Sequence, residues 1–174
     1  HVSVGSLSPE IFEQTVTVNG FSKAYAMTGW RLGYVAAPAP LAGAIAALQS
    51  HSTSGPNTFA QYGAIAALTG SDAEVQRMVD AFRERRDYLY ERLNGIDGIT
   101  CVKPMGAFYM LPNVSRFGLN SVEFSERFLD AERVATVPGA AFGAPECIRI
   151  SYACGLDEIR EGMDRLERFV SGPA

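Results

Sequence analysis

The chain has 174 residues, of which 47% are hydrophobic and 20% charged, a composition that excludes disordered, collagen-like and low-complexity proteins. Its net charge of −4 and the lack of an isolated basic block argue against a basic surface that binds nucleic acid. Three cysteines without CxxC spacing and only two histidines argue against a disulfide framework and against a metal site. The sequence shows neither a signal peptide nor an apolar run of about 18 residues, so we expect a cytoplasmic protein that does not enter a membrane.

Two apolar strands are predicted near the N-terminus. Residues 15–18 lead into the turn signal Asn19-Gly20, and residues 32–37 end before Pro38. Neither strand alternates between apolar and polar residues. This pattern favours a parallel sheet that is covered by helices on both faces.

An uncharged segment of forty residues runs from Leu32 to Ser71. Two helices are expected in it, at about residues 41–49 and 57–68. One interpretation is an alanine-rich helix pair that packs on the sheet. The other is a surface buried against a second subunit, because solvent-facing surfaces normally carry charge, and this interpretation predicts a homodimer through residues 32–71.

A long helix follows, and a differently organised region comes after it. The capping-box pattern Ser71-Asp72-Ala73-Glu74 begins the helix, and Asn94-Gly95 ends it. Shorter elements are then predicted: strands near residues 100–102, 107–111, 134–137 and 147–152, one helix near residues 121–132 and another at the C-terminal end. This order is typical of a two-layer α+β unit. We place a domain boundary at about residues 86–95, which divides the chain into residues 1–90 and 91–174.

The strongest chemical signal lies between the two predicted N-terminal strands. Lys23 follows the C-terminal end of a strand, where open α/β sheets build their binding sites, and Arg31 comes eight residues later. Desolvation or a neighbouring cation lowers the pKa of a lysine from about 10.4 and frees its amine for Schiff-base chemistry. The planar fork of an arginine suits a phosphate dianion. A pyridoxal phosphate site requires this pair, although from spacing alone a surface lysine and an ion-paired arginine are an open alternative.

A second arginine occupies a strand with clear alternation. Ile148 and Ile150 share one face of this strand, and Arg149 shares the other face with Ser151. The isoleucine face belongs in a core, so Arg149 points away from that core. A half-buried arginine requires an anion, which is either a ligand or an internal glutamate.

The run SKAYAMTGWRLGY, residues 22–34, resembles the lysine signature of the class I and II aminotransferases, the fold-type I pyridoxal phosphate enzymes. Further matches follow in the order of that family: the loop before Gln61, the GAFY of residues 106–109, and segments 137–143 and 149–152. The resemblance extends over essentially the whole chain. It implies an α/β fold in which the end of the large pyridoxal phosphate-binding domain, a mainly parallel sheet with helices, is followed by an α+β small C-terminal domain.

The resemblance also implies roles for individual residues. Lys23 is expected to bind pyridoxal 5'-phosphate covalently and to move the substrate proton. Arg31 is expected to hold the cofactor phosphate, with a weaker contribution from the hydroxyl of Ser22. A serine that often binds this phosphate three residues before the lysine is replaced by Gly20. Arg149 is expected to bind the α-carboxylate of the substrate as a bidentate pair.

Phe108 and Tyr109 alternate along one predicted strand, so only one of them can face a cleft. The resemblance favours Phe108 as the residue near the substrate. Packing of Phe108 in the core is an equally open alternative.

In detail the chain resembles the bacterial aspartate and aromatic aminotransferases, which transfer an amino group between amino acids and 2-oxo acids by a ping-pong reaction. Their glycine-rich phosphate loop, stacked aromatic residue and pyridine-binding aspartate precede the lysine by more residues than stand here, where Glu10 and Glu13 are the only acids before Lys23. The resemblance therefore implies a C-terminal fragment that is inactive alone. A carbon–sulfur lyase, the effector domain of a transcriptional regulator and a structural remnant that only dimerises are the alternatives.

Overall fold

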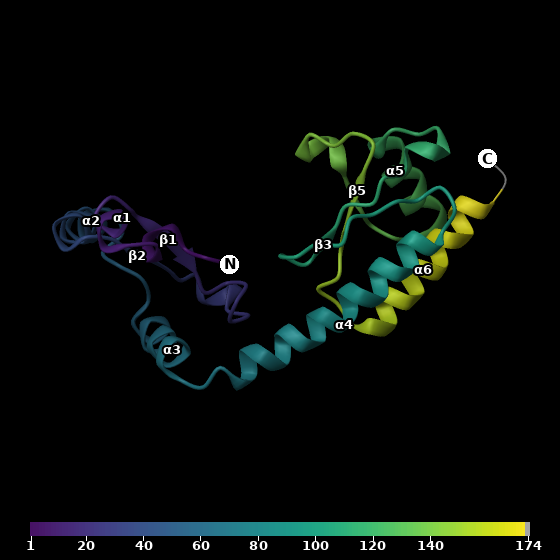
Figure 1. Cartoon of the computed structure of the whole chain (residues 1–174). Helices are drawn as coiled ribbons and strands as arrows, with labels where there is room; N and C mark the ends of the chain where they lie inside the picture. The colour runs from purple at the N-terminus through teal and green to yellow at the C-terminus, as the bar shows by residue number, and fades with distance from the viewer. Residues whose placement is uncertain (173–174) are drawn as a thin grey trace. The chain divides into compact units, whose positions relative to one another are not determined.

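The computed structural model describes residues 1–172 (Figure 1). They form two compact units, one that ends at Gln76 and one that begins at Arg77, so that the division lies within helix α4 (Ala73–Gly95). Each unit has its own hydrophobic cluster. The boundary placed at residue 90 from the sequence stays a prediction. Among the described residues, no helix is both long enough and apolar enough to span a membrane.

The first unit contains a strand pair and two apolar helices. Its elements are η1 (Val4–Ser6), α1 (Pro9–Phe12), β1 (Thr17–Gly20), η2 (Thr28–Trp30), β2 (Gly33–Ala36), α2 (Ala39–Ser52) and α3 (Thr58–Thr69). Both helices expected in the uncharged segment are present: α2 extends beyond its predicted bounds at both ends, and α3 is shifted by one residue from the predicted 57–68.

The two strands of the first unit pair antiparallel, from Thr17 opposite Ala36 to Gly20 opposite Gly33. The prediction of parallel strands covered on both faces is wrong for this pair, whose residues are almost all exposed in the chain. A run of apolar residues is common in parallel strands, but it does not by itself determine strand direction. The connection between β1 and β2 contains only a short 3₁₀ helix and returns directly, so the strand ends meet as antiparallel neighbours.

The hydrophobic cluster of the first unit is small. It consists of Phe21, Met27, Leu32, Ala60 and Ala64. Helix α2 has no buried residue, and large apolar side chains of α2 and α3 lie in solvent: Leu48 is 70% exposed, Phe59 67% and Tyr62 71%. Most of the apolar surface of these two helices is therefore not covered within the unit.

The second unit is a three-stranded antiparallel sheet packed against helices. The strands are β3 (Tyr109–Met110), β4 (Val137–Pro138) and β5 (Ile148–Ser151) in the order β3–β5–β4, and the other elements are α4, η3 (Ser115–Phe117), α5 (Ser121–Glu132), η4 (Gly139–Phe142) and α6 (Leu156–Ser171). The strand predicted at residues 100–102 is reduced to an isolated pairing of Thr100 with Asn113. The helix predicted at residues 121–132 is confirmed, and a capping box between Asn120 and Glu123 begins it.

One face of this sheet is buried. Met110 and Ile148 have no exposed surface, and they pack with residues of all three helices, among them Leu93, Phe128 and Leu166. The side chains of the intervening strand positions point to the opposite face, because successive residues of a strand alternate. Arg149 therefore belongs to the face opposite to this core.

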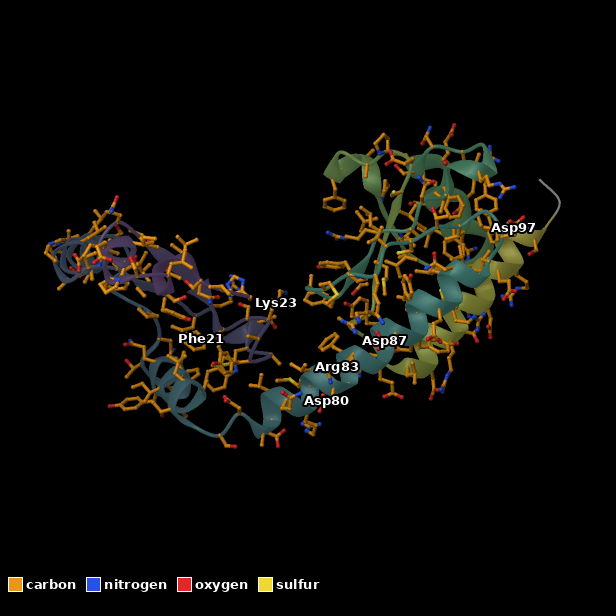
Figure 2. All side chains as sticks on the ribbon, viewed as in Figure 1. Phe21, Lys23, Asp80, Arg83, Asp87 and Asp97 are labelled. Atoms are coloured by element: carbon orange, nitrogen blue, oxygen red, sulfur yellow. The ribbon has the colours of Figure 1, made fainter. Side chains whose placement is uncertain are left out.

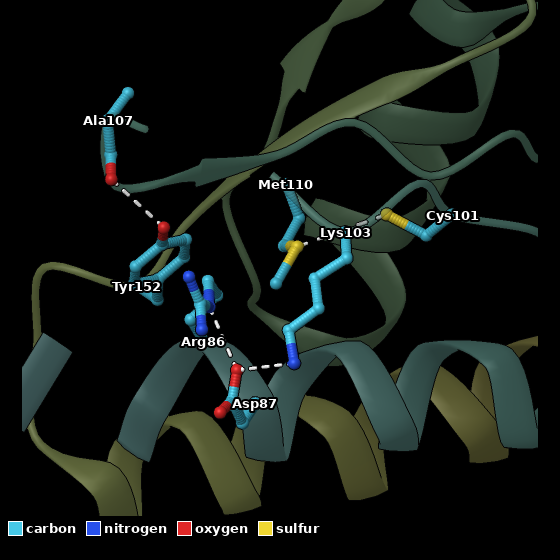
Figure 3. Close-up of polar contacts among 7 residues, drawn as sticks. All are labelled: Arg86, Asp87, Cys101, Lys103, Ala107, Met110 and Tyr152. Carbon is cyan, nitrogen blue, oxygen red and sulfur yellow. Dashed lines mark hydrogen bonds and ion pairs between the residues drawn. The ribbon is translucent and has the colours of Figure 1, made fainter. Parts of the chain in front are cut away.

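A polar cluster ties the segment before β3 to helix α4. The Asp87 carboxylate accepts hydrogen bonds from the Arg86 guanidinium and forms an ion pair with Lys103, each at 2.8 Å (Figure 3). The buried Tyr152 hydroxyl donates a 2.9 Å hydrogen bond to the carbonyl of Ala107, whose φ of 60° is left-handed. The two groups of contacts hold both ends of the segment that leads into β3.

The Asp87 contacts predict a specific pH dependence of stability. Hydrogen bonds from Arg86 and then Lys103 lower the pKa of Asp87 from 3.8 to about 2. Because the folded pKa is below the unfolded one, the stabilisation is complete above the unfolded pKa and is lost as the pH falls toward 2. We expect the stability difference between the natural chain and Asp87→Asn, measured by urea unfolding, to be constant above about pH 5 and to shrink between pH 4 and 2. A difference that does not change over that interval would contradict the assignment.

Candidate active site

Ser22, Lys23 and Arg31 all belong to the loop that connects β1 and β2, and Figure 2 shows the position of Lys23. The loop is closed at its base, where the Phe21 amide donates a 3.2 Å hydrogen bond to the Leu32 carbonyl. Phe21 and Leu32 are both buried in the hydrophobic cluster of the first unit. The buried residues at its two ends fix the loop, and its polar residues remain at the surface.

Lys23 is exposed on a turn within this loop. The Ala26 amide donates a 3.3 Å hydrogen bond to the Lys23 carbonyl, and Ala26 has a left-handed φ of 53°. Ser22, which precedes the lysine, is half-buried. The backbone at Lys23 is therefore fixed by a hydrogen-bonded turn.

Arg31 ends the short helix η2 in a left-handed conformation, with φ 52°. Its Nη1 donates a 3.1 Å hydrogen bond to the Thr28 carbonyl. The side chain lines a hollow of about 410 Å³ together with Gly29, Trp30, Asn57 and Phe59. The guanidinium therefore borders an open space and retains donors for a ligand, since a guanidinium carries five N–H groups.

The wall of this hollow depends on Gly63 of helix α3. A Cβ added at Gly63 would lie 2.6 Å from Cζ3 of Trp30, so Gly63→Ala must displace the indole ring. Alanine is favoured over glycine in a helix interior by about 1 kcal/mol, which offsets the strain of displacing the indole, so we expect little net change in stability. We expect the fluorescence emission of Trp30, the only tryptophan, to shift. Fluorescence spectra test this. Gly43→Ala on α2, where a Cβ meets nothing within 4 Å, is the matched control, and equal spectra for both variants would refute the expectation.

Arg149 lies in the second unit, on β5 opposite Val137 of β4. Its guanidinium carbon is 4.3 Å from the ring centroid of Tyr109 and 4.4 Å from that of Phe142. Within residues 1–172 the guanidinium has no carboxylate partner and no hydrogen bond, although the residue is half-buried. The internal glutamate that the sequence left as an alternative is therefore not found among the described residues.

The rings of Phe108 and Tyr109 lie 4.6 Å apart, but the two residues have different further partners. Phe108 packs against the hydrophobic cluster of the second unit, with its ring 6.1 Å from that of Phe82. Tyr109 is paired with Ser151 across the sheet, which places its side chain on the same face as that of Arg149. The contact of Phe108 with substrate stays a prediction, and Tyr109 is the aromatic residue beside the arginine.

Sequence reasoning missed Tyr109 and Phe142 as neighbours of Arg149. The signal for Phe142 was present, because the residue belongs to a segment that resembles the family. The signal for Tyr109 was its alternation with Phe108, but this could not be used without the register of β3 on β5.

The other candidate groups do not form a reactive centre. Burial raises the pKa of the thiols of the free cysteines Cys101, Cys147 and Cys154, which disfavours the nucleophilic thiolate form. In the part of the chain that the structure describes, no three histidine, cysteine or acidic side chains are grouped to hold a metal ion.

The donor sets of the two units are chemically distinct. The first unit offers an amine and a guanidinium on one loop, which suit a ligand that carries both a carbonyl and a phosphate group. The second unit offers a guanidinium without an acidic partner, which suits a carboxylate.

Comparisons with known proteins agree on one family. The family model for aminotransferase class I and II matches residues 3–166. An aspartate aminotransferase from Geobacillus stearothermophilus is 46% identical over 100% of this chain and 46% of its own length, and one from Bacillus subtilis is 47% identical over 98% and 44%. The crystal structure of an aromatic aminotransferase from Pyrococcus horikoshii matches with a TM-score of 0.89 and 44% identity, and covers 98% of this chain and 46% of that one. The chain thus spans less than half the length of these relatives.

Proposed function

Because the chain belongs to the class I and II aminotransferase family, we propose that it acts within a pyridoxal phosphate-dependent enzyme that transfers an amino group from an amino acid to a 2-oxo acid. The observation that carries this proposal is the placement of Lys23 and Arg31 on one loop with a buried base. In this proposal residues 1–90 belong to the large cofactor-binding domain, and residues 91–174 form the small C-terminal domain.

The loop between β1 and β2 provides the groups that hold the cofactor. Arg31 borders an open hollow and retains N–H donors for the phosphate, and the hydroxyl of Ser22 adds a further donor. The amine of Lys23 would hold the cofactor through its carbonyl carbon, with the carbonyl oxygen leaving as water, and would take up and return the proton of the substrate Cα. When bound, pyridoxal phosphate supplies the electron sink that makes loss of this proton possible.

The second unit provides the group that orients the substrate. The Arg149 guanidinium, which has no internal carboxylate among the described residues, binds the α-carboxylate that amino acids and 2-oxo acids share. Phe108 is proposed to lie near the substrate side chain, as the resemblance implies. A carboxylate common to both substrates explains how a single arginine serves both halves of a ping-pong reaction.

We further propose that the enzyme is a cytoplasmic homodimer. Leu48, Phe59 and Tyr62 expose large apolar surfaces on two helices that carry no charged residue, which is typical of a surface that another polypeptide covers. The three free thiols are consistent with a reducing compartment. Sedimentation of the natural chain beside Tyr62→Glu tests the dimer, because a charge buried in an interface would shift the mass toward that of a monomer.

Product analysis tests the reaction directly. We suggest a chimaera in which this chain replaces the corresponding C-terminal part of the Bacillus subtilis aspartate aminotransferase, with which it is 47% identical. The proposal predicts that an amino acid and a 2-oxo acid exchange their functional groups, and that Lys23→Ala abolishes this exchange. Release of pyruvate and ammonia from a β-substituted amino acid, without exchange, would identify a lyase instead.

A further inference from the structure

We propose that Tyr109 and Phe142 are positioning residues that hold the Arg149 guanidinium ready to bind a carboxylate. This inference rests on the proposed function in one respect, the binding of a carboxylate by Arg149. It goes further by naming the two side chains that determine how well Arg149 performs this task.

The first support is that Arg149 differs from other arginines of the second unit. Arg92 forms ion pairs with Asp164 at 2.8 Å and Glu167 at 3.2 Å, and Arg168 forms one with Glu132 at 2.7 Å. Arg149 contacts two aromatic rings and, within residues 1–172, no acidic group. Its positive charge is therefore held in place without being neutralised.

The second support comes from the geometry of a guanidinium. An aromatic ring attracts a cation that lies over its face, and a guanidinium carbon 4.3–4.4 Å from two ring centroids is well within the distance for this attraction. The N–H groups of a guanidinium point outward in its own plane, and because those of Arg149 have no hydrogen-bond partner among residues 1–172, they are available to a carboxylate. An internal carboxylate at this position would compete with the ligand, whereas the rings do not.

The third support is the way in which the fold holds the rings. Tyr109 reaches Arg149 because β3 pairs with β5 in a register that sets Tyr109 opposite Ser151. Phe142 is the last residue of η4, and Gly143 follows it with a left-handed φ of 77°. Phe142 is 50% exposed and belongs to neither hydrophobic cluster, so core packing does not explain its position.

The ring contacts should improve binding by ordering the arginine in advance. A flexible arginine loses rotamer freedom when it binds a ligand, and a side chain that is already fixed avoids this loss. A cation–π contact at an exposed site corresponds to about a two- to fivefold effect on an equilibrium constant. We therefore expect each ring to contribute about that factor to carboxylate affinity.

The test uses the 174-residue chain and pyruvate as the carboxylate probe. Side-chain Nε–Hε resonances are recorded by NMR, that of Arg149 is assigned with Arg149→Lys, and pyruvate is titrated into each variant. We expect Phe142→Leu and Tyr109→Leu each to weaken pyruvate binding about two- to fivefold and to shift the Arg149 resonance of the free protein, because a ring current is removed. Tyr109→Phe keeps the ring and should restore both the affinity and the resonance.

The outcomes separate this inference from the proposed function. If pyruvate perturbs Arg149 and all four proteins bind it equally, the positioning role is wrong while carboxylate binding stands. If the natural chain shows no pyruvate-dependent change at Arg149, both fail. Circular dichroism melting of each variant excludes unfolding as the cause, and an unshifted free Arg149 resonance in both leucine variants would overturn the inference without any ligand.

Discussion

Gly139→Ala is expected to destabilise the second unit by about 3 kcal/mol, because the new methyl group has no space that side-chain motion could provide. Gly139 is buried and is the first residue of η4, the 3₁₀ helix that ends at Phe142. A Cβ at this position would overlap the carbonyl oxygens of Ala144 and Cys147, which are backbone atoms. The Gly139 amide donates to the Cys147 carbonyl, and its own carbonyl accepts from Ala144, so the overlap also disrupts these hydrogen bonds.

Urea unfolding measures this effect, and Gly162→Ala is the matched control. Gly162 lies inside α6, where a Cβ would meet nothing within 4 Å, and it lines a cavity of about 200 Å³. Alanine in this helix should stabilise the chain by about 1 kcal/mol. The two glycine-to-alanine changes should therefore have opposite signs, and a Gly139→Ala variant as stable as the natural chain would refute the described backbone.

Arg149→Ala is expected to lower kcat/KM for transamination about 10²- to 10⁴-fold in the chimaera. The substitution would remove the proposed charge-assisted pair with the substrate carboxylate, and the loss of such an interaction costs about 3–5 kcal/mol when it is shielded from water. Arg149→Lys keeps the charge but cannot form two parallel hydrogen bonds, so its activity should lie between that of the unsubstituted chimaera and that of Arg149→Ala. Steady-state kinetics with an amino acid and a 2-oxo acid measure both halves of the reaction. A loss below tenfold for either substrate would exclude Arg149 as the carboxylate ligand.

The helices could be predicted from the sequence because their signals are local. Helix α5 has the predicted bounds, and α4 ends at Gly95 as the Asn94-Gly95 pair indicated. The strands were predicted less well, because β3 and β4 contain only two paired residues each and their limits depend on partners distant in the sequence. The direction of β1 and β2 depends on how the chain returns, and the composition of a strand does not determine this.

The candidate site shows the same contrast between features with local signals and features that depend on distant segments. Alternation along β5 correctly placed Ile148 in the core and Arg149 on the other face. The two rings beside Arg149 could not be found in this way, because they depend on the pairing of β3 with β5 and on the conformation of η4. In the first unit the motif predicts Lys23 and Arg31 as cofactor-binding residues, whereas the left-handed φ of Arg31 depends on the folded loop.

The proposal that Lys23 is the cofactor-binding lysine can be tested in the chain itself, because it contains only one other lysine, Lys103. The 174-residue protein is mixed with pyridoxal phosphate, its visible absorption is recorded, and the mixture is reduced with borohydride for peptide mass analysis. We expect an absorption band and a reduced adduct on Lys23, both lost in Lys23→Ala, weakened in Arg31→Ala and unchanged in Lys103→Ala. Equal labelling of both lysines, or a band that survives Lys23→Ala, would contradict the assignment.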